Sequence, residues 1–135
     1  MTACLFCNIV SGKIPCSKIY EDDEFFAFLD LYPINRGHTL VIPKTHCKNL
    51  LDFPKIQETD LMEVLKKVAD AVMRATKADG FNLGMNNGKA SGQVIHHAHF
   101  HIIPRFEKDG LSSWPNKEYR KGEIDKTRDE IVKFL

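Results

Sequence analysis

The sequence contains no long hydrophobic run. No apolar stretch approaches the length of about 20 residues that a helix needs to cross a bilayer. The first residues, Met1-Thr-Ala-Cys, also lack the basic region followed by a long apolar region that is typical of a secretory signal. We therefore expect a cytoplasmic protein with no membrane partner.

A large excess of charge of either sign is also absent. The 135 residues include 19 Lys and Arg against 18 Asp and Glu, which gives a formal net charge of +1. No global field attracts nucleic acid, so we expect no nucleic-acid partner, and any anionic ligand must be bound by local groups. The chain has no internal repeat or low-complexity tract, and its length and 43% hydrophobic content predict one compact domain with a modest core.

Cysteine is scarce, and two of the four cysteines form the pair Cys4-Leu-Phe-Cys7. In a reducing cytosol such residues are more typical of thiols or metal ligands than of a disulfide framework. The spacing is that of half a zinc site, which either His46 or Cys47 can help to complete. The alternatives are two buried small residues or a redox motif, although a redox pair usually follows a strand of a βαβ unit.

Histidine is concentrated in residues 92–105, Gly-Gln-Val-Ile-His-His-Ala-His-Phe-His-Ile-Ile-Pro-Arg. From His97 onward, histidine alternates with apolar residues, and this period of two predicts a strand. We expect His97, His99 and His101 to form an exposed row about 6.6 Å apart, with Ala98, Phe100 and Ile102 on the core side. His96 points the other way and is a bystander. A chance pattern and a pure metal site are the alternatives to a strand that handles phosphate.

The remaining segments predict an α+β domain with one long helix on an antiparallel sheet. Residues 59–78 carry an apolar stripe at helical spacing, with Asp60 and Glu63 as a capping box and Gly80 as the stop. Residues 120–135 suggest a surface helix or a partner-contacting tail. The expected strands, from turn residues and apolar runs, are 17–22 and 24–30 as a hairpin, 37–44, and 81–85.

Two further features suit a nucleotide without requiring one. Asp30 follows an aromatic strand face and can accept hydrogen bonds from sugar hydroxyls, although an ordinary turn before Tyr32-Pro33 explains it equally. Gly92, in the loop 86–93, would let backbone N–H groups approach a phosphate, although a hairpin turn also explains Asn87-Gly88. His38, at the start of its strand, is ordinary when considered alone.

Taken together, these motifs resemble the histidine-triad (HIT) nucleotide-binding superfamily, and its zinc-containing bacterial and Hint-like branch. The resemblance implies the HIT-like fold, a five-stranded antiparallel sheet with one long helix, extended across a homodimer. It implies a core of about residues 4–105 with a C-terminal tail over 106–135, and nucleotidyl transfer to water through a covalent histidine intermediate. The motifs that carry it are Cys4-x-x-Cys7, Tyr20–Asp23, Ala27–Asp30, Gly37–His46, Asn86–Gly88 and Gly92-Gln93 with the triad and Ile-Pro-Arg105.

The resemblance also implies residue roles. His99 would be the nucleophile, because a neutral imidazole attacks well when its other nitrogen is held as N–H. His101 would bind the transferred phosphate together with backbone N–H groups near Gly92 and Gln93, and His38 would orient the triad. Asp30 would hold the ribose of an AMP-like purine nucleotide. The residues implied for the base pocket and for further nucleotide contacts are Phe26, Phe28, Leu29 and Asn86.

Zinc-containing members of the branch resemble this chain at four ligand positions: Cys4, Cys7, His46 and His97. Two thiolates and two imidazoles suit a tetrahedral structural zinc. An all-cysteine site that uses Cys16 and Cys47 is the alternative.

One position departs from the family pattern. Relatives usually place Ser or Thr two residues after the loop glycine, where this chain has Val94, so the side-chain donor is lost and only the backbone N–H is left. We expect either a phosphate contact that is weaker by about 1 kcal/mol, the value of one lost hydrogen bond, or a shifted leaving-group preference. The sequence thus predicts a hydrolase of nucleotide phosphoramidates or dinucleoside polyphosphates. Its rivals are a weakly catalytic or non-catalytic nucleotide-binding homodimer with structural zinc, and a bare metal-binding protein.

Overall fold

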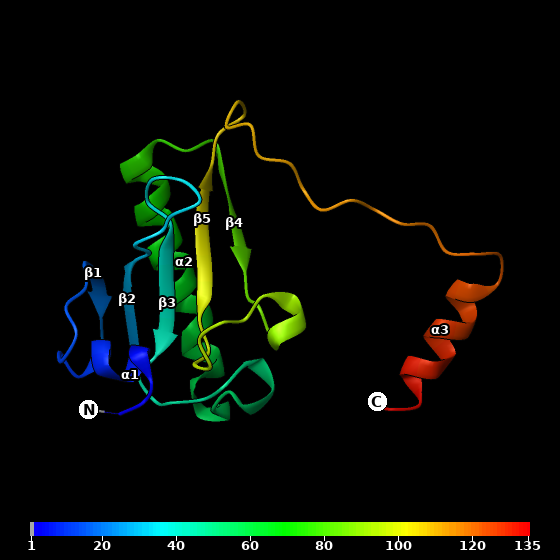
Figure 1. The fold of residues 1–135 in the computed structure, drawn as a ribbon, viewed down its shortest axis with the longest axis horizontal. Helices are drawn as coiled ribbons and strands as arrows, with labels where there is room; N and C mark the ends of the chain where they lie inside the picture. Colours follow the sequence, from blue (N-terminus) through cyan, green and yellow to red (C-terminus); the bar gives the residue numbers. More distant parts are fainter. Residues whose placement is uncertain (1) are drawn as a thin grey trace.

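A five-stranded antiparallel sheet with one long helix on one face forms the body of the molecule (Figure 1). The computed structural model describes residues 2–135. The strand order is β1-β2-β3-β5-β4, and every neighbouring pair is antiparallel. The α+β prediction is confirmed. The strands are β1 (Lys18–Glu21), β2 (Phe25–Leu29), β3 (Thr39–Pro43), β4 (Gly80–Gly84) and β5 (Phe100–Arg105), and the α-helices are α1 (Leu5–Val10), α2 (Glu58–Thr76) and α3 (Glu123–Val132).

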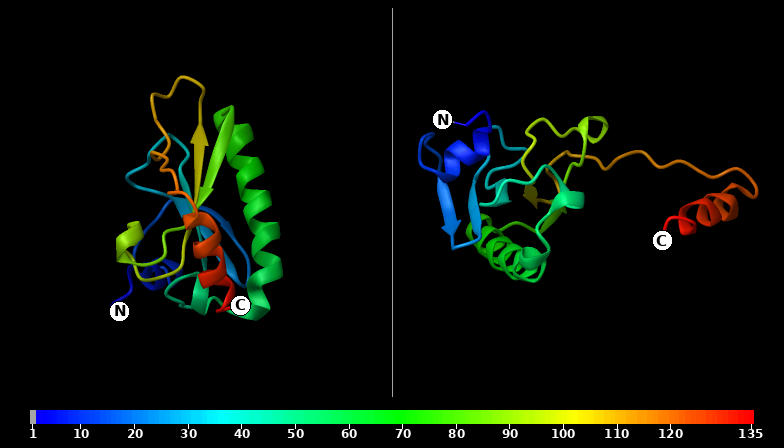
Figure 2. Two further views of the ribbon diagram at one scale, coloured as in Figure 1. Left: turned by 90° about the vertical axis from the view of Figure 1, so that its right-hand side faces the viewer. Right: turned by 90° about the horizontal axis from the view of Figure 1, so that it is seen from below.

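The main core lies between the sheet and α2, which runs along one face of the sheet (Figure 2, left). The helix contributes one apolar stripe, as its 3.6-residue periodicity predicts. The buried side chains of this layer include Phe25, Ala27, Val41, Phe100 and Ile102 from the sheet and Leu61, Val64, Leu65, Val68 and Val72 from α2.

The short helix α1 covers part of the opposite face. Phe6 and Ile9 of α1 pack against Phe26, Phe28 and Leu40 in a second buried cluster. Strands β2 and β3 are therefore buried on both faces, which explains why they are almost continuously apolar instead of alternating.

The long helix predicted over 59–78 is present as α2 with bounds that differ by one residue at its start and two at its end, but both predicted end signals were wrong. The helix follows a 3₁₀ turn (Lys55–Gln57) whose backbone already leads into it, and no side chain caps its start, so Asp60 and Glu63 form no capping box. It ends where Lys77 adopts the left-handed conformation, with φ of 56°. Gly80 opens β4 instead of stopping the helix.

Strand β5 begins later than its alternating sequence predicted. It pairs with β3 from Phe100 and with β4 from His101, so His97 and His99 precede the strand. The preceding backbone is held differently, because the N–H of Ala98 donates to the carbonyl of Cys47 beyond the end of β3. The local pattern correctly assigned Ala98, Phe100 and Ile102 to the core, but not the start of the strand.

The C-terminal segment leaves the body. Residues 112–122, here called the arm, run past β4 and lead to α3, which stands clear of the sheet (Figures 1 and 2). The helix predicted within 120–135 is therefore present over a shorter range. Among the described residues, no helix combines the length and apolar character needed to span a membrane.

Candidate active site and metal centre

The register of the sheet places one row of side chains from three strands on the face opposite α2. Phe28 pairs with Leu40 and Leu40 with His101, so these three side chains form one row across the sheet. The neighbouring row, Leu29, Thr39 and Ile102, faces the α2 layer. The structure therefore places Leu29 on the face away from the histidines, whereas Phe26 and Phe28 lie on the histidine face beneath α1.

His38 and His101 form a short hydrogen-bonded relay. The backbone N–H of Ile34 donates to His38 Nδ1 at 3.1 Å, so that nitrogen carries no proton. The proton of the neutral His38 ring is therefore on Nε2 and is donated to His101 Nδ1 at 2.8 Å. By the same logic His101 keeps its own proton on Nε2. That nitrogen is buried and has no hydrogen-bond partner among the described residues.

His99 is held in the opposite tautomer to His101, with its proton on Nδ1. Its Nδ1–H donates to the carbonyl oxygen of His97 at 2.7 Å, which leaves a lone pair on Nε2. The rings of His99 and His101 are adjacent, with centroids 5.0 Å apart. A nucleophilic lone pair and an unpaired N–H donor thus lie side by side, as attack on a phosphate requires.

The histidines are buried, not exposed as the alternating pattern predicted. His97 is fully buried and His99 is 7% exposed, because α1 covers them and Phe6 packs edge-on against His99 at 5.2 Å. Burial lowers the pKa of His38 and of His99 below the ordinary value. Burial, helped by His99 and His38, lowers the pKa of His101 to about 4. The relay is therefore neutral at pH 7.

Asp30 lies at the end of β2 beside this relay. Its Oδ2 is 3.7 Å from His38 Nε2, and its Oδ1 accepts the backbone N–H of Tyr32 at 2.9 Å. Both early interpretations are thus compatible with the structure: the side chain shapes the turn, and one oxygen faces the histidines.

The loop after β4 is braced by its own glutamine. The buried Gln93 side chain accepts from the N–H of Gly88 at 2.8 Å and donates to the carbonyl of Lys48 at 2.6 Å. The backbone N–H groups of Gly92 and Gln93 donate to the carbonyls of Lys89 and Gly88 within the loop. These two donors, expected to face a phosphate, are already used.

Asn86 at the start of this loop and Val94 directly after it complete this account. Asn86 packs against Gly92, and a Cβ added to Gly92 would lie 3.4 Å from Asn86 Nδ2. The φ of Gly92 is 94°. The Val94 side chain is 80% exposed. Its backbone N–H has no hydrogen-bond acceptor among residues 2–135, and neither do the N–H groups of Ile95 and His96 that follow it.

Phe6 and Ile9 of α1 are two site residues that were not predicted from the sequence. Both are buried on the histidine face, and Phe6 contacts the His97 and His99 rings as well as Phe28. The available signal was their spacing: Phe6 and Ile9 are three residues apart beside Cys7, so on a helical turn they lie on one face.

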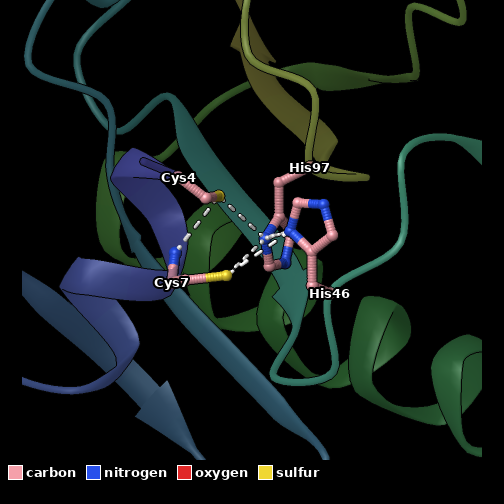
Figure 3. Close-up of side chains that lie close together, drawn as sticks. All are labelled: Cys4, Cys7, His46 and His97. Atoms are coloured by element: carbon pink, nitrogen blue, oxygen red, sulfur yellow. Dashed lines mark hydrogen bonds between the residues drawn. The ribbon is translucent and has the colours of Figure 1, made fainter. Parts of the chain in front are cut away.

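A second cluster forms around Nδ1 of His97, where the side chains of Cys4, Cys7 and His46 converge on it (Figure 3). The two cysteines come from the start and first turn of α1, His46 follows β3, and His97 precedes β5. His97 Nδ1 is 3.4 Å from Cys4 Sγ, 3.5 Å from Cys7 Sγ and 3.3 Å from His46 Nδ1. Cys7 Sγ is 3.4 Å from His46 Nδ1.

These donors fit a tetrahedral metal ion. Ligands held 2.0–2.3 Å from a tetrahedral centre are roughly 3.3–3.8 Å apart, which matches the observed spacings. His97 Nε2–H donates to the carbonyl of Pro43 at 2.8 Å, so its Nδ1 lone pair points into the cluster, as in a ligand oriented by a backbone carbonyl. Burial and the neighbouring Cys4 raise the pKa of Cys7 to about 11, so the thiol gives up its proton only when a cation compensates.

Other candidate metal groupings are less suitable. Cys47 is buried in the main core and Cys16 packs at the edge of the second cluster, so the all-cysteine alternative is wrong. Asp30, His38 and His101 also lie close together. Both nitrogens of His38 are engaged in hydrogen bonds, however, so this group is a proton-ordered relay and not a set of free lone pairs.

Comparison with known proteins places the chain among nucleotide-related relatives. A model of the HIT domain family matches residues 11–108. An adenylylsulfatase from Arabidopsis thaliana is 41% identical over 131 residues, 96% of this chain and 66% of that protein, so the chain spans just under two thirds of its length. An adenosine 5'-monophosphoramidase from Saccharomyces cerevisiae is 41% identical over 135 residues, 98% of this chain and 83% of that protein.

Solved structures agree over almost the whole chain. A Streptococcus mutans protein, 42% identical, superposes with a TM-score of 0.90 and covers 98% of this chain and 85% of its own. A HIT family member from Bacillus subtilis, 37% identical, also gives 0.90 and covers 99% and 98%. A zinc-bound histidine triad family protein from Mycobacterium smegmatis, 37% identical, gives 0.77 with 98% of each chain covered.

Proposed function

Since the chain belongs to the HIT domain family, we propose that it hydrolyses a nucleotide phosphoramidate or a dinucleoside polyphosphate through a nucleotidyl-histidine intermediate. Related proteins carry the names adenylylsulfatase and adenosine 5'-monophosphoramidase, which supports a nucleotide hydrolase acting on an AMP-like group. The choice between an amine and a nucleotide as leaving group is left to experiment.

The observation that carries this proposal is the unpaired Nε2–H of His101 beside the lone pair of His99. A buried donor without an acceptor costs about 1–3 kcal/mol, so its persistence beside a nucleophile suits a site that binds an oxyanion. The relay from Ile34 through His38 keeps this proton aimed at the site.

In the proposed reaction, His99 Nε2 attacks the α-phosphorus as the bond from phosphorus to the leaving group breaks. The Nε2–H of His101 donates to a phosphoryl oxygen and stabilises the charge that develops there, and the N–H of Val94 is the backbone donor that supports it. Water then attacks phosphorus and breaks its bond to His99. The leaving group of the first step takes up a proton from solvent as it departs. In the second step the nucleoside monophosphate leaves, the attacking water releases its proton to solvent, and the neutral imidazole is restored.

Nucleotide contacts follow from the same arrangement. Asp30 is proposed to hold the ribose hydroxyls, with Phe28 and Phe26 beneath the base and with Phe6 and Ile9 of α1 closing the histidine face. Leu29 is not retained in this pocket, because the register turns it to the α2 face.

Zinc is proposed for the cluster of Cys4, Cys7, His46 and His97, because two thiolates and two imidazoles at tetrahedral spacings suit it. Its contribution would be structural: it would fix α1 against the segment that carries His97.

A homodimer is also proposed, with the two sheets joined at their β4 edges. Strand β4 is the last strand in the order, so its outer edge is unpaired among the described residues, and the strand carries the exposed side chains Phe81 and Leu83. An exposed apolar edge strand is a ready partner for a second strand.

The deciding experiment is intact-protein mass spectrometry after rapid acid-free quenching with an adenosine phosphoramidate, with zinc measured on the same samples. We expect a transient nucleotidyl adduct on the wild type and none on His99→Ala. An adduct that persists in His99→Ala would refute the assignment of the nucleophile.

The second candidate is a nucleotide-binding homodimer with little catalysis, which Val94 favours because the usual side-chain hydroxyl is missing. Bound nucleotide and about one zinc per chain, a stoichiometry expected for a four-ligand site, without adduct or turnover, would select it.

A further inference from the structure

The turn between β2 and β3 supplies the backbone N–H that sets the direction of the histidine relay. The N–H of Ile34 donates to His38 Nδ1 at 3.1 Å, and the N–H of His38 donates to the carbonyl of Asn35 at 3.0 Å. The Ile34 side chain is 53% exposed, so burial of that residue does not hold its amide in place. A neutral imidazole can carry its proton on either nitrogen, so the position of this turn decides which tautomer His38 adopts.

The other tautomer of His38 would reverse the relay. With the proton on His38 Nδ1, its Nε2 would accept a hydrogen bond from His101 Nδ1, across the same 2.8 Å contact. His101 would then have a lone pair on Nε2, the buried nitrogen that has no partner among the described residues. A lone pair repels a phosphoryl oxygen instead of donating to it. The donor proposed for the phosphate therefore exists in only one of the two arrangements.

The side chain of Asn35 ties this turn to a distant part of the chain. Its Nδ2 donates to the carbonyl of Pro104 at 2.8 Å and to Asp109 Oδ2 at 3.1 Å. A primary amide has two N–H donors, and both are used here. The turn is thereby attached to the end of β5 and to the turn that follows it.

Asp109 is itself a fixed point. Its carboxylate accepts from Nε and Nη2 of Arg105 at 2.8 and 3.2 Å, and from the backbone N–H groups of Phe106 and Leu111. The hydrogen bond from Arg105, with those from the backbone, holds the pKa of Asp109 below its ordinary range, so the acceptor of Asn35 is an anion. Hydrogen bonds to a charged group are stronger than those between neutral groups.

The turn is also packed closely against the body. A Cβ added to Gly37 would lie 2.6 Å from Thr76 Cγ2 and 3.3 Å from Pro104 Cγ. The turn thus lies against the end of α2 and the end of β5 (Figure 1). Steric contact prevents it from moving inward, whereas movement outward is opposed by attractive contacts such as those of Asn35.

We propose that Asn35 is a positioning residue that fixes the tautomer of His38 and, through it, the N–H of His101. Asn35 acts through the Ile34 amide and touches no reacting atom. Its effect on turnover rests on the proposed function. Its effect on the imidazole protons does not, because the relay is complete without a substrate.

The test compares Asn35→Ala with Asn82→Ala in the full chain. Asn35→Ala keeps the backbone carbonyl that accepts from His38 and removes both side-chain donors. The control is matched, because Asn82 Oδ1 accepts from Arg105 Nη1 at 2.7 Å but makes no hydrogen bond to the turn.

The first readout is the set of imidazole ¹⁵N chemical shifts, which report where each proton lies. In the wild type and in Asn82→Ala, we expect protonated Nε2 and unprotonated Nδ1 in both His38 and His101. In Asn35→Ala, the Nδ1 shifts of both rings should move toward the protonated value. Asn35→Ser keeps one hydroxyl donor in place of two N–H groups, so it gives the same test with a smaller shift if Asn35→Ala does not fold.

The second readout is turnover of an adenosine phosphoramidate. In Asn35→Ala, kcat should fall at least about tenfold, and by less than the roughly 10²–10³-fold that loss of a whole oxyanion donor causes. KM should change much less than kcat, and Asn82→Ala should retain the wild-type kcat.

Three results would overturn the proposal. A wild-type His38 with its proton on Nδ1 would show that the turn does not set the tautomer. Unchanged imidazole shifts in a folded Asn35→Ala protein would show that Asn35 does not hold the turn, whatever the rate. Shifted protons with an unchanged kcat would show that the reaction does not need the N–H of His101. A wild type without adduct or turnover would refute the proposed function alone, because the imidazole shifts would still test the role of Asn35.

Discussion

His97 and His99 are two residues apart, yet their side chains belong to clusters built on opposite rules. In the metal cluster, lone pairs converge: Nδ1 of His46 and Nδ1 of His97 lie 3.3 Å apart with two sulfurs nearby. In the cluster proposed to be catalytic, donors and acceptors alternate from Ile34 through His38 to His101. Convergent lone pairs need a cation, whereas an alternating chain is satisfied by protons alone.

The comparison teaches how to separate a metal site from a catalytic site in a histidine-rich segment. Proximity does not separate them, because Asp30, His38 and His101 are also close together. The hydrogen bond made by the second nitrogen of each ring does, because it fixes where the lone pair points. The following changes test this division, beginning with the largest expected effect.

Replacing His99 by Ala should break the catalytic cluster alone. We expect kcat for an adenosine phosphoramidate to fall at least about 10⁴-fold, because the nucleophile is lost. Metal content should be unchanged. The matched control is His96→Ala, an exposed neighbour, which should keep full activity. Steady-state kinetics and metal analysis on both variants check this; loss of metal in His99→Ala would contradict the division.

Replacing His97 by Ala should break the metal cluster alone. The carbonyl that accepts from His99 is retained, whereas one of four ligands is lost. We expect loss of bound zinc and a fall of at least about 3 kcal/mol in the free energy of unfolding, since metal-binding energy is folding energy at such sites. Well below the melting temperature, kcat should fall less than about tenfold.

Urea denaturation and zinc analysis of His97→Ala check these values, with Cys16→Ser as the control because that thiol is outside the cluster. A complete loss of turnover in a folded His97→Ala protein would show that the two clusters are not separable.

Lowering the pH should reduce the free energy of unfolding through His101, a member of the hydrogen-bonded relay and not of the metal cluster. Burial and the neighbouring histidines lower the pKa of His101 to about 4 in the folded chain. In the unfolded chain this imidazole is protonated near pH 6.5, whereas in the folded chain it stays neutral at that pH. Its contribution to stability is therefore complete above pH 6.5 and is lost as the pH falls from 6.5 toward 4. The slope should reach up to about 1.4 kcal/mol per pH unit.

The measurement is the free energy of unfolding of the wild type and of His101→Gln from pH 7.5 to 5. The wild type should lose stability more steeply than the variant, and the difference isolates His101 from any effect of metal release. Parallel curves would contradict a neutral buried His101.

The smallest effect concerns Asp30. Changing it to Asn keeps the acceptor for the N–H of Tyr32 but removes the charge proposed to hold the ribose. We expect KM to rise about fivefold to tenfold for a ribonucleotide, the equivalent of about 1 kcal/mol, and to change little for the 2',3'-dideoxy analogue. Asp23→Asn, in the exposed turn before β2, is the control. An equal loss with both substrates would remove Asp30 from ribose recognition.

Much of this arrangement follows from local sequence. The apolar runs of β2 and β3 and the stripe of α2 predicted the layers, and the alternation after Phe100 predicted which side of β5 faces the core. The cluster around Cys4 and Cys7 followed from a resemblance to known zinc-containing relatives, because Cys-x-x-Cys alone specifies only half a site.

What the sequence could not predict depends on distant packing. The burial of His97 and His99 is imposed by α1, some 90 residues earlier in the chain, so the local pattern wrongly predicted an exposed row. The use of the Gly92 and Gln93 amides within their loop depends on its three-dimensional closure. The left-handed Lys77 carries no glycine signal, and tertiary context overrides local propensity there.

The bond from His99 to the carbonyl of His97 has an evolutionary consequence. Every amino acid has a backbone carbonyl, so the side chain at position 97 could change during evolution, with loss of the proposed zinc site. The hydrogen bond that fixes the tautomer of His99, the proposed nucleophile, would be kept. Position 99 has no such freedom, because there the side chain itself is the proposed nucleophile. A metal-free descendant of this protein would therefore be expected to retain the middle histidine and to strengthen the packing of α1 by apolar substitutions around Phe6.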